Sequence, residues 1–193
     1  MGLLDLIGRG TRSLDDACAL AEDLADGGSY ISLHSIVSLS ADLLHAVVTR
    51  LASASLSGVS EVSLPIDSVT DARWAGDDQL SWTFTDVADP VELLAPRLEP
   101  FGARAALELP ASRRRTESEC RSGAARIRLV RGTTSREGRE YFGSTHEADK
   151  AFVRCAKALL NPEAGNALLP SFATGDVRLI EIVQALAQGL AKA

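Results

Sequence analysis

Residues 69–85 read VTDARWAGDDQLSWTFT, and the expected fold depends on this stretch. Within residues 80–85, apolar and polar side chains alternate, which is the period of a strand with one buried face. The turn-forming run at 75–78 separates this strand from an earlier extended run at 69–74. Two extended runs joined by such a turn predict an antiparallel β-hairpin.

Further strands are expected on both sides of the hairpin. Alternating patterns occur at 61–66, 105–109 and 125–129, and residues 30–39 are apolar and β-branched, with one slip in phase that indicates a bulge. Pro65 places its strand at a sheet edge. The sequence therefore predicts an α+β fold, in which a mainly antiparallel sheet of about five to seven strands carries helices packed largely on one face.

The clearest helix signal is the run Ser144-Thr-His-Glu147, which matches a capping box. An apolar stripe follows it, and Asn161-Pro162 ends the helix. Other helices are expected after Ser13, ending at Gly27-Gly28; after Ser40; at 90–101, with a bend at Pro96; and from about 174 to 190.

Length and composition favour one globular domain. The chain has 193 residues, of which 46% are hydrophobic and 24% charged, so it can bury a core without disulfides or metals. We expect a single α+β domain over 1–193, with two small lobes as the alternative. Residues 110–124 are polar and have no apolar period, and this predicts a loop that is mobile or functional.

Charge and cysteine content narrow the class of protein. The net charge of −6 disfavours nucleic acid and anionic membranes as partners. No apolar stretch reaches the ~20 residues that span a bilayer, and nothing resembles a secretory signal. The three cysteines are Cys18, Cys120 and Cys155, and they are odd in number and dispersed in sequence. They indicate reduced thiols in a cytoplasmic protein.

No motif for catalysis, metal binding or cofactor binding is found. The chain has no P-loop, no G-x-G-x-x-G and no G-x-S-x-G. His146 with Glu147 and Asp149 is either an acid–base cluster or part of a helix cap. Asp77 and Asp78 either bind a hard cation or form an ordinary turn. We therefore expect no catalytic residue, metal or cofactor, and a non-enzyme is the favoured class.

The main charge asymmetry is a stretch of nine arginines between residues 113 and 139. One interpretation is a solvated loop and hairpin. The other is a docking patch for an acidic partner, a phosphate group or nucleic acid. The arginines assigned to this patch are Arg113, Arg114, Arg115, Arg126 and Arg128.

The last helix is apolar over more than one stripe. Such a helix is buried on two sides or contacts a partner. Leu179 and Ile182 are assigned to this contact surface. The function that we expect is that of a non-enzymatic protein-binding or adaptor domain, immunity-like or chaperone-like, with a protein partner or self-association through this helix.

A family resemblance supplies the alternative function. The final fifty residues run from a polar hairpin through Glu147 and Phe152 to Leu169-Pro-Ser-Phe-Ala-Thr-Gly-Asp176 and an amphipathic helix. This order resembles the end of the substrate domain in Gfo/Idh/MocA oxidoreductases. The family's E-K-P motif and its dinucleotide-binding half are absent. The resemblance implies an enzyme or enzyme fragment.

Overall fold

The structure, a computed structural model, describes residues 31–34, 60–68, 80–132, 139–161 and 169–190. The chain divides into two compact units. Unit 1 comprises residues 1–86 and 97–105, and unit 2 comprises residues 87–96 and 106–193. The helices expected after Ser13 and Ser40, the turn at 75–78 with its two aspartates, and Cys18 lie outside the described residues.

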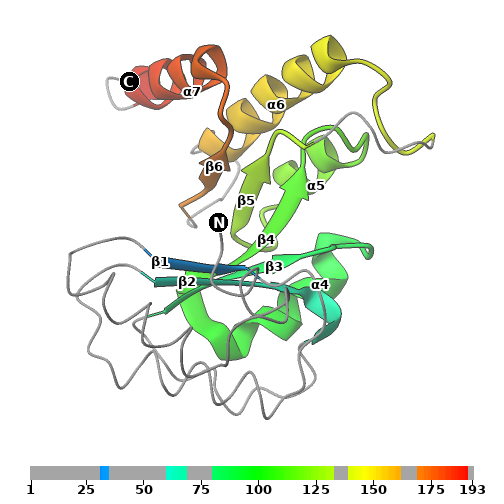
Figure 1. The fold of residues 1–193 in the computed structure, drawn as a ribbon, viewed down its shortest axis with the longest axis vertical. Helices are drawn as coiled ribbons and strands as arrows, with labels where there is room; N and C mark the ends of the chain where they lie inside the picture. The colour runs from blue at the N-terminus through cyan, green and yellow to red at the C-terminus, as the bar shows by residue number, and fades with distance from the viewer. Residues whose placement is uncertain (1–30, 35–59, 69–79, 133–138, 162–168, 191–193) are drawn as a thin grey trace, which may run out of the picture. The chain divides into compact units, whose positions relative to one another are not determined.

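All described strand pairings of unit 1 are parallel (Figure 1). Strand β1 pairs with β2, and β2 pairs with β3, with Val62 in register with Trp82. The described elements of this unit are β1 (Ile31–His34), β2 (Ser60–Pro65), the 3-10 helix η1 (Ile66–Ser68), β3 (Leu80–Thr85) and the 3-10 segment η2 (Glu99–Arg104).

Strand β3 is buried on both of its faces. On one face, Trp82 and Phe84 pack edge-on against Phe101 of η2, with ring centroids 5.3 and 4.9 Å apart. On the other face, the hydroxyl of Thr83 donates to Glu61 Oε1 at 2.5 Å, and both side chains are buried. The polar side chain of Thr83 in β3 therefore faces a buried hydrogen-bonding partner rather than solvent.

Unit 2 alternates strands with helices. Strand β4 pairs with β5 and β5 pairs with β6, again in parallel. Parallel neighbours need a crossover connection, which α5 and α6 provide here. The elements are α4 (Val91–Leu98), β4 (Ala105–Pro110), α5 (Thr116–Ser122), β5 (Ile127–Val130), α6 (Thr145–Leu160), β6 (Ser171–Ala173) and α7 (Val177–Leu190). The first residue of β4 and the last two of α4 are grouped with unit 1.

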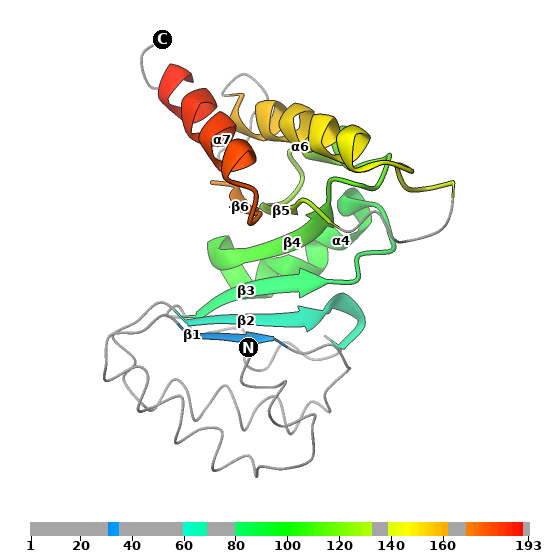
Figure 2. The same cartoon turned by 45° about the horizontal axis from the view of Figure 1, so that its top comes forward.

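Helix α6 is the central packing element of unit 2. It packs against β5, α5 and α7, and Figure 2 shows α6 and α7 side by side over β5 and β6. Phe152 is fully buried, and its ring lies 6.3 Å from that of Phe172 in β6. The predicted cap is confirmed, because the Ser144 side chain accepts a hydrogen bond from the Glu147 backbone N–H.

The predicted fold class is wrong. The sheet is parallel and the fold is of the α/β type, not α+β with a mainly antiparallel sheet. Alternation in the sequence shows that a segment is a strand, but it carries no information on the direction of its neighbour. The apparent hairpin was also misleading because residues 66–79 connect two parallel strands, β2 and β3.

Other boundaries differ in detail. The segment 110–124, expected to be a loop, contains α5, which ends at Gly123 in the left-handed conformation with φ of 66°. The expected helix at 90–101 is divided into α4, with Pro96 inside it, and η2. Strand β6 was not expected, because three residues are too few to show a period.

Candidate ligand-binding site

The carboxyl ends of β4, β5 and β6 lie at one edge of the unit 2 sheet. Parallel strands all end at the same edge, and ligands of α/β proteins commonly bind there. Backbone hydrogen bonds join the three ends, because Ala111 N–H donates to the Val130 carbonyl at 2.8 Å and Arg131 N–H to the Ala173 carbonyl at 3.2 Å. Side chains that follow these strands are therefore brought together.

A hollow of about 530 Å³ lies at the ends of β5 and β6. It is open to solvent on one side, and both backbone and charged groups reach it. The residues that line it are Val130, Arg131, Gly132, Ala173, Thr174, Gly175 and Asp176.

Four charged side chains form an alternating chain beside the hollow. Arg131 Nε lies 2.7 Å from Asp149 Oδ1, and Arg178 lies 3.7 Å from the other Asp149 oxygen. Arg178 also pairs with Asp176 at 2.6 Å. The hydrogen bonds from Arg178 hold the pKa of Asp176 at about 2, so this carboxylate is charged at neutral pH.

Gly132 forms the turn after β5 and admits no side chain. Its φ is +77°, and a Cβ atom there would come within 2.6 Å of Ser112 Oγ and 2.9 Å of Pro110 Cβ. Only glycine adopts this conformation at little cost. Ser112 is 1% exposed, and its Oγ has no hydrogen-bond partner in the described part of the chain.

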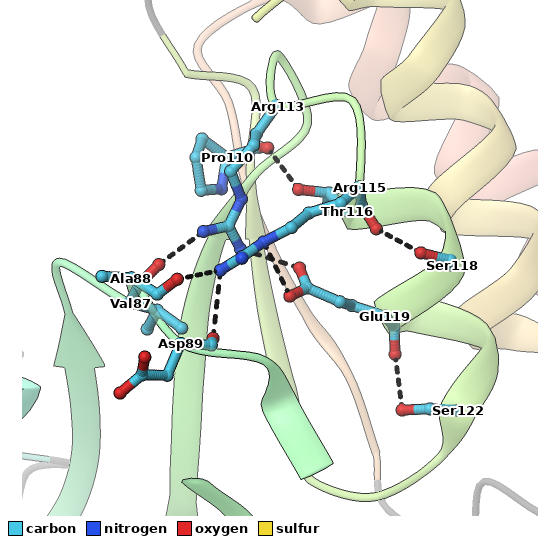
Figure 3. Close-up of polar contacts among 10 residues, drawn as sticks. All are labelled: Val87, Ala88, Asp89, Pro110, Arg113, Arg115, Thr116, Ser118, Glu119 and Ser122. Atoms are coloured by element: carbon cyan, nitrogen blue, oxygen red, sulfur yellow. Dashed lines mark hydrogen bonds and ion pairs between the residues drawn. The ribbon is translucent and has the colours of Figure 1, made fainter. Parts of the chain in front are cut away.

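A second set of charges follows β4, and two of its members, Arg113 and Glu119, are buried (Figure 3). The Arg113 guanidinium is 5% exposed and donates to the Val87 carbonyl at 2.5 Å and to Glu119 Oε2 at 2.7 Å. Arg115 donates to the carbonyls of Ala88 and Asp89, and its Nε lies 3.1 Å from Glu119 Oε1. We call Arg113, Arg115 and Glu119 the arginine clamp, since they tie α5 to residues 87–89.

The clamp surrounds one carboxylate with two cations. Burial raises the pKa of Glu119, and the charges of Arg113 and Arg115 oppose that rise. The Thr116 hydroxyl adds a further tie, because it donates to the Pro110 carbonyl at 2.8 Å. In the described part of the chain, three buried atoms of the clamp still have no hydrogen-bond partner: Arg113 Nε, Arg115 Nε and Glu119 Oε1.

The structure separates the five arginines that were assigned to a docking patch. Arg113 and Arg115 belong to the clamp. Arg114 is exposed and lies 4.7 Å above the Phe142 ring. Arg126 donates to the Leu169 carbonyl, and Arg128 pairs with Glu108 at 3.4 Å. These contacts give most of the predicted patch a role within unit 2.

The two assigned residues of α7 also differ from each other. Leu179 is buried at 3% exposure, whereas Ile182 is 39% exposed. Only the second is placed to contact a partner.

The sequence reasoning missed the residues of the hollow. Arg131-Gly132 and Thr174-Gly175-Asp176 each follow a strand directly, which would have marked them if the strands had been recognised as parallel. The sequence places Asp149 with His146 and Glu147 in either an acid–base cluster or a helix cap. In the structure it pairs with Arg131, while Glu147 serves the cap.

Within the described ranges, no group of three or more His, Cys, Asp or Glu side chains is arranged to hold a metal ion. None of the helices there combines the length and hydropathy that a bilayer span requires. Cys120 and Cys155 are buried free thiols on α5 and α6. A hydrogen bond between the two thiols and burial both raise the pKa of Cys120.

Comparisons with known proteins identify no relative. No family model matches the chain, and searches of curated proteins and of solved structures find no match. The resemblance to Gfo/Idh/MocA oxidoreductases therefore stays a prediction.

Proposed function

We propose that unit 2 binds a small polar molecule in the hollow at the ends of β5 and β6. The observation that carries this proposal is the position of the hollow at the carboxyl edge of parallel strands. Strand ends in α/β folds point loops and helix N-termini into one crevice, which is why ligands bind there in unrelated proteins.

The lining indicates the chemistry of the ligand. Arg131 in the lining offers a forked donor for a carboxylate or phosphate, and Asp176 in the lining offers acceptors for a cationic group. Asp149 and Arg178 pair with these two side chains from beside the hollow. Gly132 gives the lining its turn, since a Cβ atom there would collide with Ser112 and Pro110. A small molecule with at least one charged group fits this arrangement.

The test is a titration of isotope-labelled protein followed by NMR. The probes are inorganic phosphate, citrate and putrescine, which cover two kinds of anion and one cation. We expect at least one probe to shift the amide signals of Gly132, Thr174 and Gly175. Arg131→Gln should weaken the binding of an anionic probe at least tenfold, which is about 1.4 kcal/mol.

Arg126→Gln is the matched control, because Arg126 is bound to the Leu169 carbonyl and does not line the hollow. It should bind the same probe with unchanged affinity. If none of the three probes shifts these amide signals, the proposal is wrong for the ligand classes named.

Protein binding is the second candidate function, in the immunity-like or chaperone-like sense of an adaptor. The observation that favours it is the exposure of large apolar side chains on α7, with Val177 at 64%, Ile180 at 38% and Ile182 at 39%. Val177 and Ile180 are three residues apart and share a face of α7, and Ile182 lies on another face. Exposed apolar surface of this kind marks interaction sites on soluble domains. Replacing Ile182 with Ser should then weaken partner binding without changing the melting temperature of the domain.

A further inference from the structure

A groove lies between the C-terminal parts of α6 and α7, away from the hollow. Its volume is about 500 Å³. Apolar groups make up most of its walls, and two cations border it. The lining residues are Arg121, Lys157, Ala158, Leu160, Asn161, Ala185, Leu186 and Gly189.

Helix α7 leaves the flank beside this groove uncovered. It buries Leu179 and half-buries Val183 and Leu186. Ile182, Ala185 and Gly189 follow one another at three- and four-residue spacing and so lie on one flank, where each is exposed. A Cβ atom on Gly189 would meet nothing within 4 Å. A second helix thus has room to approach α7 closely here.

We propose that the occupant of this groove is a second copy of the same chain, with the two α7 helices packed antiparallel about a two-fold axis. This inference goes beyond the binding of a small molecule, and it rests on the second candidate function. A two-fold interface requires a surface that is complementary to itself. The flank of α7 and the groove beside it carry charges of both signs, Glu181 on the helix and Lys157 in the groove.

The charges decide the register of the two helices. Suppose that the two antiparallel helices cross at Ala185. A residue four positions before the crossing on one helix then faces the residue four positions after it on the other. Glu181 therefore faces Gly189 of the second copy. Lys157 and Gly189 both line the groove. Glu181 of each copy is therefore brought to Lys157 of the other.

Both of these side chains are available for that pairing. Lys157 and Glu181 are exposed, and in the described part of the chain neither makes an ion pair. The two-fold axis repeats the pair, so the interface contains it twice. Two cross-copy ion pairs at the rim and an apolar centre form a self-complementary arrangement.

The experiment measures the mass of the full chain in solution by sedimentation equilibrium over a concentration series. We expect a dimer that dissociates on dilution. The variants Lys157→Glu and Glu181→Lys should each raise the dimer dissociation constant at least tenfold, because each places like charges together twice. Lys150→Glu, the same charge change two turns away on α6, should leave the constant unchanged.

The decisive experiment mixes the Lys157→Glu and Glu181→Lys variants in equal amounts. In the mixed dimer, the new glutamate at position 157 of one copy meets the new lysine at position 181 of the other. At the other end the unchanged Lys157 meets the unchanged Glu181, so attraction is restored at both ends. Native mass spectrometry should show the mixed dimer in excess over either variant paired with itself. A chain that stays monomeric at about 100 µM, or variants that fail to prefer each other, would overturn the proposal.

The outcome is separate from that of the two candidate functions. Arg131→Gln in the hollow should leave the dimer intact, and the charge variants should still bind the NMR probe. If the wild-type chain is monomeric while Ile182→Ser weakens the binding of another protein, the adaptor function stands and the second copy is rejected.

Discussion

Two sets of ion pairs follow the strands of unit 2, and they are built for different purposes. The arginine clamp after β4 encloses Glu119 between two guanidinium groups, with Arg113 only 5% exposed. The charges beside the hollow lie nearer to solvent, and Arg178 is 75% exposed. Both sets pair arginines with carboxylates, but burial makes Arg113 and Glu119 a structural tie, whereas the more exposed set is the one that we propose binds a ligand.

Removing an arginine from the clamp should have the largest effect on stability. Arg113→Ala leaves the buried Glu119 carboxylate with Arg115 as its remaining cation partner and deprives the Val87 carbonyl of a donor. Breaking a buried ion pair from one side costs about 3–5 kcal/mol. Urea unfolding should show a loss of that size.

Arg114→Ala is the matched control, since Arg114 is exposed and contacts the Phe142 ring only at the surface. Its loss should cost about 1 kcal/mol or less. Equal effects of the two changes would mean that the clamp contributes no more than a surface contact.

The turn at Gly132 should be the next most sensitive position to substitution. Gly132→Ala forces a Cβ atom toward Ser112 and holds alanine at φ of +77°. A non-glycine residue in such a conformation costs on the order of 1–3 kcal/mol. Gly175→Ala tests the same change where a Cβ atom has space. Thermal unfolding should therefore separate the two variants, with Gly132→Ala melting lower.

The pH dependence of stability should distinguish the buried carboxylate from the exposed one. Burial raises the folded-state pKa of Glu119, so the folded state holds this proton more tightly than the unfolded state does. Its contribution is fully present below the unfolded pKa and is lost as the pH rises through the folded value. Glu119→Gln should remove this component from the difference in unfolding free energy between pH 5 and pH 7. A pH profile that the substitution leaves unchanged would contradict the raised pKa.

The smallest effect is expected at the exposed pair. The pKa of Asp176 is about 2 because Arg178 donates hydrogen bonds to it. Arg178→Gln should move that pKa toward the ordinary aspartate value of about 3.9. NMR titration of the side-chain carboxyl carbon measures it directly, and stability should change little because the pair is solvated. A pKa that stays near 2 in the variant would show that another group sets it.

Only part of the candidate site could be predicted from the sequence. Arg113 was noted for its charge, but its partner Glu119 looked like one more polar residue of a loop. Short turns of helix such as α5 carry too few residues for a period to be seen. Asp149 and Arg131 are 18 residues apart, and no spacing rule connects them.

The sequence by itself determined the local elements, because their causes are local. The capping box at Ser144 and the stop at Asn161 come from hydrogen bonds between near neighbours, and both agree with α6. Strand positions in the middle of the chain follow from alternation, as in β3 and β5. Only the tertiary structure decided that the strands run parallel and which arginines are buried. Those outcomes depend on contacts between residues far apart in sequence, and the free energy of such contacts is not encoded in any short stretch of the chain.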